Sequence, residues 1–282
     1  MEINSVEKGI GILKTDGRLR FFFLGVGSAF TKKHFQTNLL VIKGEDHLLI
    51  DCGTLCSRSL YALGLSITDI KNFLITHSHA DHIGGLEEAA LMARYVTRVK
   101  PRLIIDARYE HILWEMSMRG GCAYNEEVAG SILSFKDFWE VIRPKFLPEY
   151  PRETLDSACG DIKIKMMRTR HIPNSADNWT SSFWSCGVII NDRVMYSSDT
   201  RFDPELITDY DDRFELEVIF HDCQFFTGGV HASLEELKEL PETIKAKMYL
   251  VHYGDNWENF ADIVKDYGFA GLGQQHVGYD FF

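Results

Sequence analysis

Residues His77, His79, Asp81 and His82 stand within six positions of one another, in the sequence HSHADH. Imidazole and carboxylate groups are common protein ligands of zinc, and they also suit manganese, iron and cobalt. His77 and His79 can reach one cation from a bent loop, whereas Asp81 and His82 point another way and can reach a second. Zinc takes about four ligands, one of them a water in a catalytic site, so this loop begins two metal sites and completes neither.

The missing ligands are predicted at the ends of three apolar strands further along the chain. His171 follows IKMMRTR, Asp199 follows VMYSS, and His252 follows MYLV. Residues in such places begin functional loops, and the carboxylate of Asp199 can bridge two cations. We therefore predict a centre for two divalent metal ions, with zinc favoured, made of seven residues: His77, His79, Asp81, His82, His171, Asp199 and His252.

The elements that must position these residues are short strands and helices that follow one another along the chain. Strands are predicted at 19–25, 37–44, 46–53, 70–76, 102–106, 161–171, 186–199, 216–222 and 246–254. Helices are predicted at 57–65, 85–96, 233–240 and 256–268. The first strand is expected to form a hairpin with residues 9–15 through a turn at Asp16–Gly17. Strands that precede helices repeatedly predict an α/β fold, in which ligands gather outside the strand ends.

The 282 residues have an ordinary globular composition, 45% hydrophobic and 25% charged. We predict one domain over 1–282, with a helical insert around 107–155. The insert carries several aromatic residues at helical spacing, which favours the core. Two other roles stay open for these aromatic residues, a cap over the pocket and a dimer face. The residues are Trp114, Tyr124, Phe135 and Trp139.

Charge and local composition disfavour several classes of protein. A net charge of −11 disfavours an extended nucleic-acid-binding surface, because such a surface needs many contacts from Lys and Arg to phosphate. No apolar run is long enough to span a membrane, and MEINSVEKGIGIL lacks the features of a secretory signal. The six cysteines form no CxxC pair, so reduced thiols and a cytoplasmic location are expected.

HSHADH and four further motifs together resemble the metallo-β-lactamase superfamily. These are Asp51 in LLIDCG, His171, Asp199 in YSSDT and His252 in LVHYG, in the same order as in the family. The resemblance spans residues 51–252 and implies an αβ/βα sandwich of two mixed sheets flanked by helices.

The resemblance also implies a role for each motif residue. It assigns one metal to three histidines, His77, His79 and His171. It assigns the other metal to Asp81, His82 and His252, with Asp199 as the bridge. Asp51 is implied to be a structural support behind the metal loop rather than a ligand, which fits the need of such ligands for outer partners.

Other residues indicate which branch of the superfamily the chain resembles. The best-known β-lactamases carry cysteine at the position of Asp199, which disfavours that activity, while thioesterases similar to glyoxalase II keep aspartate. The stretch FLGVGSAFTKKHFQTNLLV resembles the opening of the ribonuclease Z and phosphodiesterase branch. FHDCQF (220–225) and VHASLEEL (230–237) fall where that branch has its HEAT-like segment and a further histidine.

This match makes His231 the predicted proton donor to the leaving alkoxide, beside Asp81 as the other predicted catalytic residue. The helix that begins just after His231 is expected to disfavour the imidazolium and so keep the pKa of His231 low.

Ribonuclease Z carries a long arm rich in Gly and Pro between its third histidine motif and its bridging aspartate. Residues 172–198 leave no room for one. The chain therefore resembles the members without an arm, among them phage and bacterial cyclic nucleotide phosphodiesterases. By this resemblance, GSAFTKKHFQTN places four residues at the substrate: Ser28, Lys32, Lys33 and His34. Phe30, His34 or Phe35 are candidates to stack on a base, and a merely solvated loop is the alternative reading.

The predicted function is hydrolysis of a small phosphodiester, above all a cyclic nucleotide, to the linear monophosphate by a hydroxide that bridges two metals. Two alternatives stay open: a ribonuclease Z-like nuclease acting on tRNA 3′ ends, and a non-catalytic nucleotide-binding protein on the same fold. A homodimer is expected, because relatives are commonly dimers.

Overall fold

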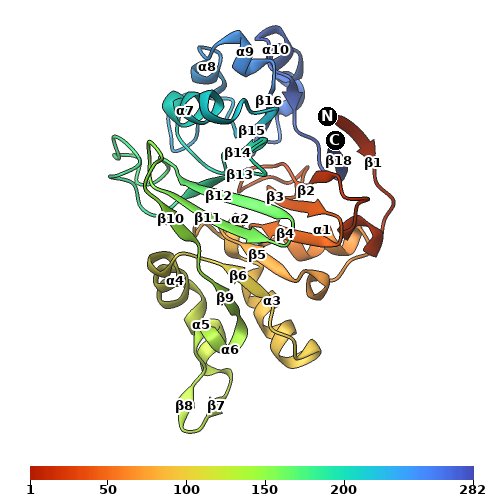
Figure 1. Ribbon diagram of the computed structural model, residues 1–282, viewed down its shortest axis with the longest axis vertical. Coiled ribbons are helices and arrows are strands. Elements are labelled where there is room, and N and C mark those ends of the chain that lie inside the picture. The colour runs from red at the N-terminus through yellow and green to blue at the C-terminus, as the bar shows by residue number, and fades with distance from the viewer.

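A computed structural model describes residues 1–282. Two sheets of eight strands each pack face to face, and helices cover their outer sides (Figure 1). Both sheets contain parallel and antiparallel pairs. The predicted α/β architecture of two mixed sheets flanked by helices is confirmed.

The first sheet contains strands from the N-terminal half and the last strand of the chain. In spatial order they are Glu2–Ser5 (β1), Val277–Phe281 (β18), Leu19–Gly25 (β2), Asn38–Lys43 (β3), Asp46–Ile50 (β4), Asn72–Leu74 (β5), Arg102–Ile104 (β6) and Glu140–Ile142 (β9). The second sheet runs in chain order through Lys145–Leu147 (β10), Thr154–Cys159 (β11), Ile162–Arg168 (β12), Cys186–Ile190 (β13), Val194–Tyr196 (β14), Val218–Asp222 (β15), Met248–Val251 (β16) and Gly271–Leu272 (β17).

The helices are short. They span Cys56–Ala62 (α1), Ala80–Ile83 (α2), Leu86–Met92 (α3), Ala107–Leu113 (α4), Arg119–Cys122 (α5), Phe135–Phe138 (α6), Pro204–Phe214 (α7), Leu234–Leu237 (α8), Glu242–Lys245 (α9) and Ala261–Asp266 (α10). α1 and α3 lie on the outer side of the first sheet, and α7 to α10 lie on the outer side of the second (Figure 1). A capping box of Ser233 and Glu236 is present at the start of α8.

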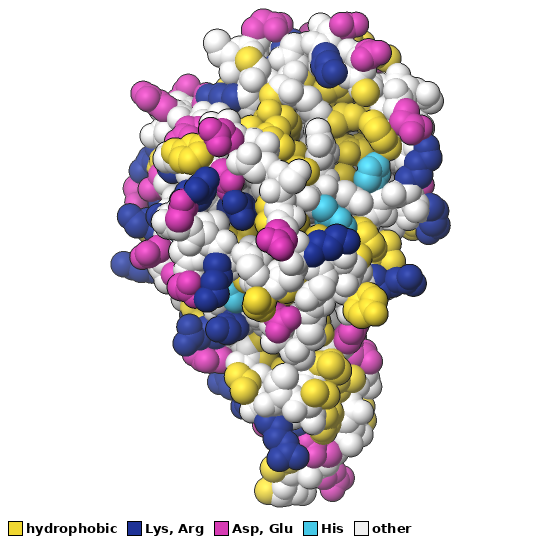
Figure 2. Space-filling model, turned by 90° about the vertical axis from the view of Figure 1, so that its right-hand side faces the viewer, with side chains coloured by type: hydrophobic (Ala, Val, Ile, Leu, Met, Phe, Trp, Pro, Cys, Tyr) yellow, Lys and Arg dark blue, Asp and Glu magenta, His cyan; other side chains and the backbone are white.

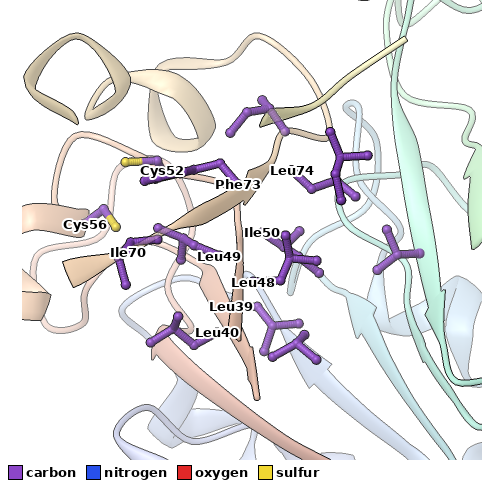
Figure 3. Packing of buried hydrophobic residues seen from close by; sticks show 14 of the residues in the cluster. Leu39, Leu40, Leu48, Leu49, Ile50, Cys52, Cys56, Ile70, Phe73 and Leu74 are labelled. Atoms are coloured by element: carbon purple, nitrogen blue, oxygen red, sulfur yellow. The ribbon is translucent and has the colours of Figure 1, made fainter. Parts of the chain in front are cut away.

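The main core fills the space between the sheets, because β2, β3 and β4 are nearly continuous apolar runs buried on both faces. Phe23 of β2 meets Phe220 of β15 across this space, with ring centroids 4.9 Å apart. Figure 3 shows the part of this core formed by β3, β4 and β5, with seven labelled strand residues: Leu39, Leu40, Leu48, Leu49, Ile50, Phe73 and Leu74. The loops that leave β4 and β5 therefore start from rigidly packed strands.

The segment 107–155 contains α4, α5, α6 and a small hairpin of Glu127–Val128 (β7) and Ser131–Ile132 (β8), and this part projects from the layered body (Figure 1). Trp114, Phe135 and Trp139 are buried and pack on one another, whereas Tyr124 is exposed. The same segment also supplies β9, β10 and the first two residues of β11 to the two sheets.

The surface carries both signs of charge. Lysine and arginine side chains are interspersed with acidic ones over the face in Figure 2, and hydrophobic side chains lie among them toward its narrow end. No helix has the length and apolar character needed to cross a membrane. All six cysteines are buried and unpaired. The homodimer stays a prediction.

The predicted N-terminal hairpin is wrong. Residues Ile10–Leu13 form a 3-10 helix whose Ile12 and Leu13 are buried, and β2 pairs instead with β3 and β18. The place beside β2 is thus taken by a strand about 260 residues away in the sequence, supported by a buried ion pair from Arg20 Nε to Asp280 Oδ1 at 2.6 Å. The turn motif at Asp16–Gly17 carries no information about β18, the competing strand so far along the chain.

Replacing Asp280 by asparagine is expected to lower the free energy of unfolding by about 2 kcal/mol at pH 7, because it leaves the largely buried Arg20 without its counter-charge. Burial alone would raise the pKa of Asp280, but hydrogen bonds from Arg20 and Asn4 outweigh it and lower that pKa below its ordinary value. The stabilisation is therefore present above the ordinary carboxyl pKa and is lost as the pH falls through the lowered one. Urea unfolding of both proteins between pH 7 and pH 3 should show the difference shrink, and an equal difference at every pH would contradict this.

Candidate metal centre

The candidate site lies where the ends of strands from both sheets meet. Asp51 directly follows β4, and the HSHADH loop follows β5, the next strand of the first sheet. On the second sheet, His171 comes after β12, Asp199 after β14 and His252 directly after β16. The sequence motifs thus sit at strand ends as predicted, and the packing of the two sheets brings their loops together.

One cluster joins three histidines with Asp199. His79 Nδ1 lies 3.0 Å from His77 Nε2 and 3.2 Å from His171 Nε2. Together with an oxygen of Asp199, these atoms all lie within 4.8 Å of one another, and the group could hold one metal ion. Burial lowers the pKa of His77, and it lowers the pKa of His171 to about 4. Neutral imidazoles, the form that binds metal, are therefore favoured at neutral pH.

A second cluster lies beside the first and shares Asp199 with it. Asp81 Oδ2 lies 3.1 Å from His252 Nε2 and 3.3 Å from His82 Nε2. Burial alone would raise the pKa of Asp81, but His82 and His252 outweigh it and lower that pKa below its ordinary range. These four residues could hold another metal ion. The structure thus brings all seven predicted ligands together in two groups around one carboxylate.

The Asp199 carboxylate shows that the donor set fits cations. Its Oδ2 lies 3.3 to 3.8 Å from ring nitrogens of five histidines: His77, His82, His171, His231 and His252. Asp199 is only 1% exposed, yet neither carboxylate oxygen has a hydrogen-bond partner, and His82 Nε2 beside it has none either. Leaving a charged group buried and unpaired is costly. Divalent ions between these atoms would satisfy the oxygens and the imidazole lone pairs together.

Asp51 supports the metal loop from behind. Its Oδ2 lies 2.7 Å from His82 Nδ1, and its Oδ1 accepts a hydrogen bond from the backbone N–H of Thr76 at 2.8 Å. Contact with a carboxylate favours a proton on Nδ1 of His82, which leaves Nε2 as the ring atom that would bind a metal ion. These contacts support the role that the family resemblance implied for Asp51, which stays a prediction.

Three residues of the site adopt backbone conformations that are unusual for residues with side chains. The φ angles of Asp51, Ser198 and His252 are 66°, 50° and 61°. Such positive values are uncommon outside glycine and tend to cluster where the surrounding structure holds functional groups in place. The chain therefore turns sharply just after β4, β14 and β16, three of the strands that present groups to the site.

Asp222 is the residue that sequence reasoning missed. It is fully buried, its Oδ2 lies 2.8 Å from His231 Nδ1, and its Oδ1 lies 3.3 Å from His252 Nδ1. Asp222 ends β15, so the strand-end pattern that pointed to Asp199 also points to it. One carboxylate thus orients the ring of His231 and lies close to a second histidine of the site, His252.

His231 lies at the site, but the predicted direction of its pKa shift is wrong. Burial alone would lower the pKa, yet Asp222 outweighs burial and raises it above the ordinary value. The nearby helix, α8, has only four residues, and a buried carboxylate at 2.8 Å has the larger effect.

The four residues predicted to contact substrate lie on a loop beside the strand end of His252. The backbone N–H of Ser28 donates a hydrogen bond to the carbonyl of Tyr253 at 3.0 Å. Asp255 accepts hydrogen bonds from the backbone N–H groups of Lys32 and Lys33, so the loop is anchored.

The side chains of this loop differ in their surroundings. Lys33 Nζ lies 2.9 Å from Glu258, and the ring of His34 packs near Tyr253 and Trp257, with centroids 5.6 and 5.7 Å apart. Lys32 and Phe30 are exposed. Contact of substrate with Ser28, Lys32, Lys33 and His34 stays a prediction.

Comparison with known proteins agrees with the fold and with the family resemblance. The family model described as Anti-Pycsar protein Apyc1 matches residues 19–279. A protein of that description from Paenibacillus sp. (strain J14) is 37% identical over 243 residues, which cover 86% of this chain and 92% of that protein. Another from Bacillus phage BSP38 is 39% identical over 258 residues, covering 90% and 96%.

Among solved structures, the chain resembles the metallo-β-lactamase fold protein YhfI from Bacillus subtilis. The TM-score is 0.68 at 15% sequence identity, and the match covers 94% of this chain and all of that one. At such identity the likeness concerns the fold alone, and it confirms the predicted metallo-β-lactamase sandwich.

Proposed function

The chain belongs to the family of Anti-Pycsar protein Apyc1, and from that membership we propose that it is a metal-dependent phosphodiesterase that opens cyclic nucleotides to linear monophosphates. The observation that carries the proposal is the buried carboxylate of Asp199, which has no hydrogen-bond partner and faces five histidines. A small phosphodiester is favoured over tRNA because 172–198 forms no arm and the chain carries a net charge of −11.

We assign two divalent ions to the site, one to His77, His79 and His171 and the other to Asp81, His82 and His252, with Asp199 shared. When bound, such ions activate a water molecule for attack on phosphorus and neutralise charge on the phosphate oxygens.

The chain's own residues orient the histidines of the site and supply the proton for the leaving group. Asp51 holds the ring of His82, and Asp222 holds the ring of His231 and lies within ion-pair distance of His252. Asp222 keeps a proton on Nδ1 of His231, so Nε2 is the atom that gives a proton to the leaving ribose oxygen. That transfer lets the P–O bond break to give a hydroxyl group rather than an alkoxide.

The proposal is tested with purified protein, a panel of 3′,5′-cyclic nucleotides, precursor tRNA and bis(p-nitrophenyl) phosphate, with products separated by chromatography. We expect linear monophosphates from cyclic nucleotides, intact tRNA, and loss of activity after chelation that added zinc or manganese restores. Cleavage of tRNA with untouched cyclic nucleotides would favour a nuclease. Binding of cyclic nucleotides without turnover of any substrate would favour a non-catalytic binder.

A further inference from the structure

One buried tyrosine reaches the metal loop from the segment 107–155. Tyr109 lies on α4 and is 1% exposed, and Ser78 Oγ donates a hydrogen bond to its hydroxyl at 3.0 Å. Ser78 stands between His77 and His79, so this bond holds the middle of the loop that carries both histidines.

The ring of Tyr109 also stacks on Trp184, in the segment that follows His171. The two centroids are 5.7 Å apart and the ring planes differ by 9°. The guanidinium groups of Arg108 and Arg168 lie near the ring of Trp184, at 5.1 and 5.0 Å from its centroid, within the range of cation–π attraction. Trp184 is therefore held by three neighbours, and it is buried, with 7% of its surface exposed.

Arg168 ties this tryptophan segment to the strand that leads into His171. It is the last residue of β12, and it donates hydrogen bonds to three backbone carbonyl groups: Ser182, Phe183 and Ser185. The backbone N–H of Thr169 also donates to the carbonyl of Ser185 at 3.1 Å. The stack thus touches the HSHADH loop on one side and the surroundings of His171 on the other.

We propose that the stack of Tyr109 and Trp184 is a positioning unit for one metal site, the site formed by His77, His79 and His171 with Asp199. The inference rests on the proposed function, because it assumes that both clusters bind metal. The three histidines come from two separate segments of the chain, and the stack links those two segments. The other site has different neighbours, since Asp51 Oδ2 lies 2.7 Å from His82 Nδ1 and Asp222 Oδ1 lies 3.3 Å from His252 Nδ1.

The proposal predicts a selective effect. Removing the hydroxyl of Tyr109 leaves Ser78 free to turn and relaxes the spacing between His77 and His79. Loss of outer partners of metal ligands typically weakens metal binding about 10-fold to 100-fold, so we expect about tenfold at this one site. The site that contains Asp81, His82 and His252 keeps its affinity.

The test compares Tyr109→Phe, Ser78→Ala and the double variant with the wild type. Metal-free proteins are titrated with zinc in competition with a chromophoric chelator, which yields two stepwise dissociation constants. We expect one constant to rise about tenfold in each variant, with no further rise in the double variant, because all three lose the same hydrogen bond. At limiting zinc kcat falls and excess zinc restores it, while KM for a cyclic nucleotide is unchanged.

Tyr210→Phe is the matched control. Tyr210 is also fully buried, and its hydroxyl also bonds to one hydroxyl group, that of Thr154, but it lies on α7 in the other core cluster. We expect both of its zinc constants to match those of the wild type.

The outcomes separate the two proposals. A wild type that binds fewer than two zinc ions would contradict the proposed function itself. A wild type that binds two ions, with Tyr109→Phe unchanged in both constants, would overturn the positioning role. An equal weakening of both constants in Tyr109→Phe and Tyr210→Phe would also overturn it, because general loosening would then account for the effect.

Discussion

Replacing Asp199 by alanine is expected to abolish hydrolysis of cyclic nucleotides, with a loss of about 10³-fold or more in kcat. The same change is expected to remove metal from the purified protein, because both clusters share this carboxylate. Without Asp199, each cluster loses one ligand atom and the negative charge that would offset the charge of a bound cation. Elemental analysis after purification, beside kcat on a cyclic nucleotide, measures both effects together.

Two further variants make the Asp199 result specific. Asp199→Asn keeps the shape of the side chain and removes its charge, so it should lose metal and activity as alanine does. Asp280→Asn removes another buried carboxylate, whose hydrogen-bond partners are Arg20 and Asn4 rather than residues of the site, and should keep its metal and its activity below its melting temperature. An Asp199→Ala protein that retained two ions and turnover would contradict the shared-ligand assignment.

Replacing His231 by alanine is expected to lower kcat on cyclic nucleotides by about 10²-fold to 10⁴-fold, the usual contribution of a positioned proton donor. A ribose alkoxide is a poor leaving group and needs that proton. p-Nitrophenolate leaves readily without one, so kcat on bis(p-nitrophenyl) phosphate should fall much less. The ratio of the two rates is therefore the measurement, and metal content should be unchanged.

Asp222→Asn should reproduce part of the His231 effect, because the amide cannot hold the His231 ring by charge. His111→Ala, which removes an exposed histidine on α4, serves as the control and should leave both rates alone. Equal losses on both substrates in His231→Ala would show that His231 does not protonate the leaving group.

The sequence predicted which residues come together at the candidate site better than it predicted the strand pairing. His171, Asp199 and His252 each end an apolar strand, and that local pattern was enough to find them once HSHADH had been noticed. Asp222 obeys the same pattern at the end of β15 and could have been found by it. The distances between the candidate ligand atoms depend on how the two sheets pack. A local sequence pattern does not predict that packing.

Two errors show where local reasoning fails. The turn at Asp16–Gly17 suggested a hairpin, but β18 occupies the edge of β2, and its pairing spans nearly the whole chain. The pKa of His231 was expected to follow a nearby helix, yet the carboxylate of Asp222 lies at 2.8 Å and decides its direction. In both cases a contact made by tertiary packing outweighs a neighbour in sequence.

The division of the ligands between the two sheets also bears on how the protein holds together. His77, His79, Asp81 and His82 follow a strand of the first sheet, while His171, Asp199 and His252 follow strands of the second. Ions bound between them would cross-link the N-terminal and C-terminal halves of the chain. Bound metal at 100 times its dissociation constant adds about 2.7 kcal/mol per independent site to the folded state. Removal of bound metal would then lower the free energy of unfolding by that amount, which urea unfolding with and without a chelator measures.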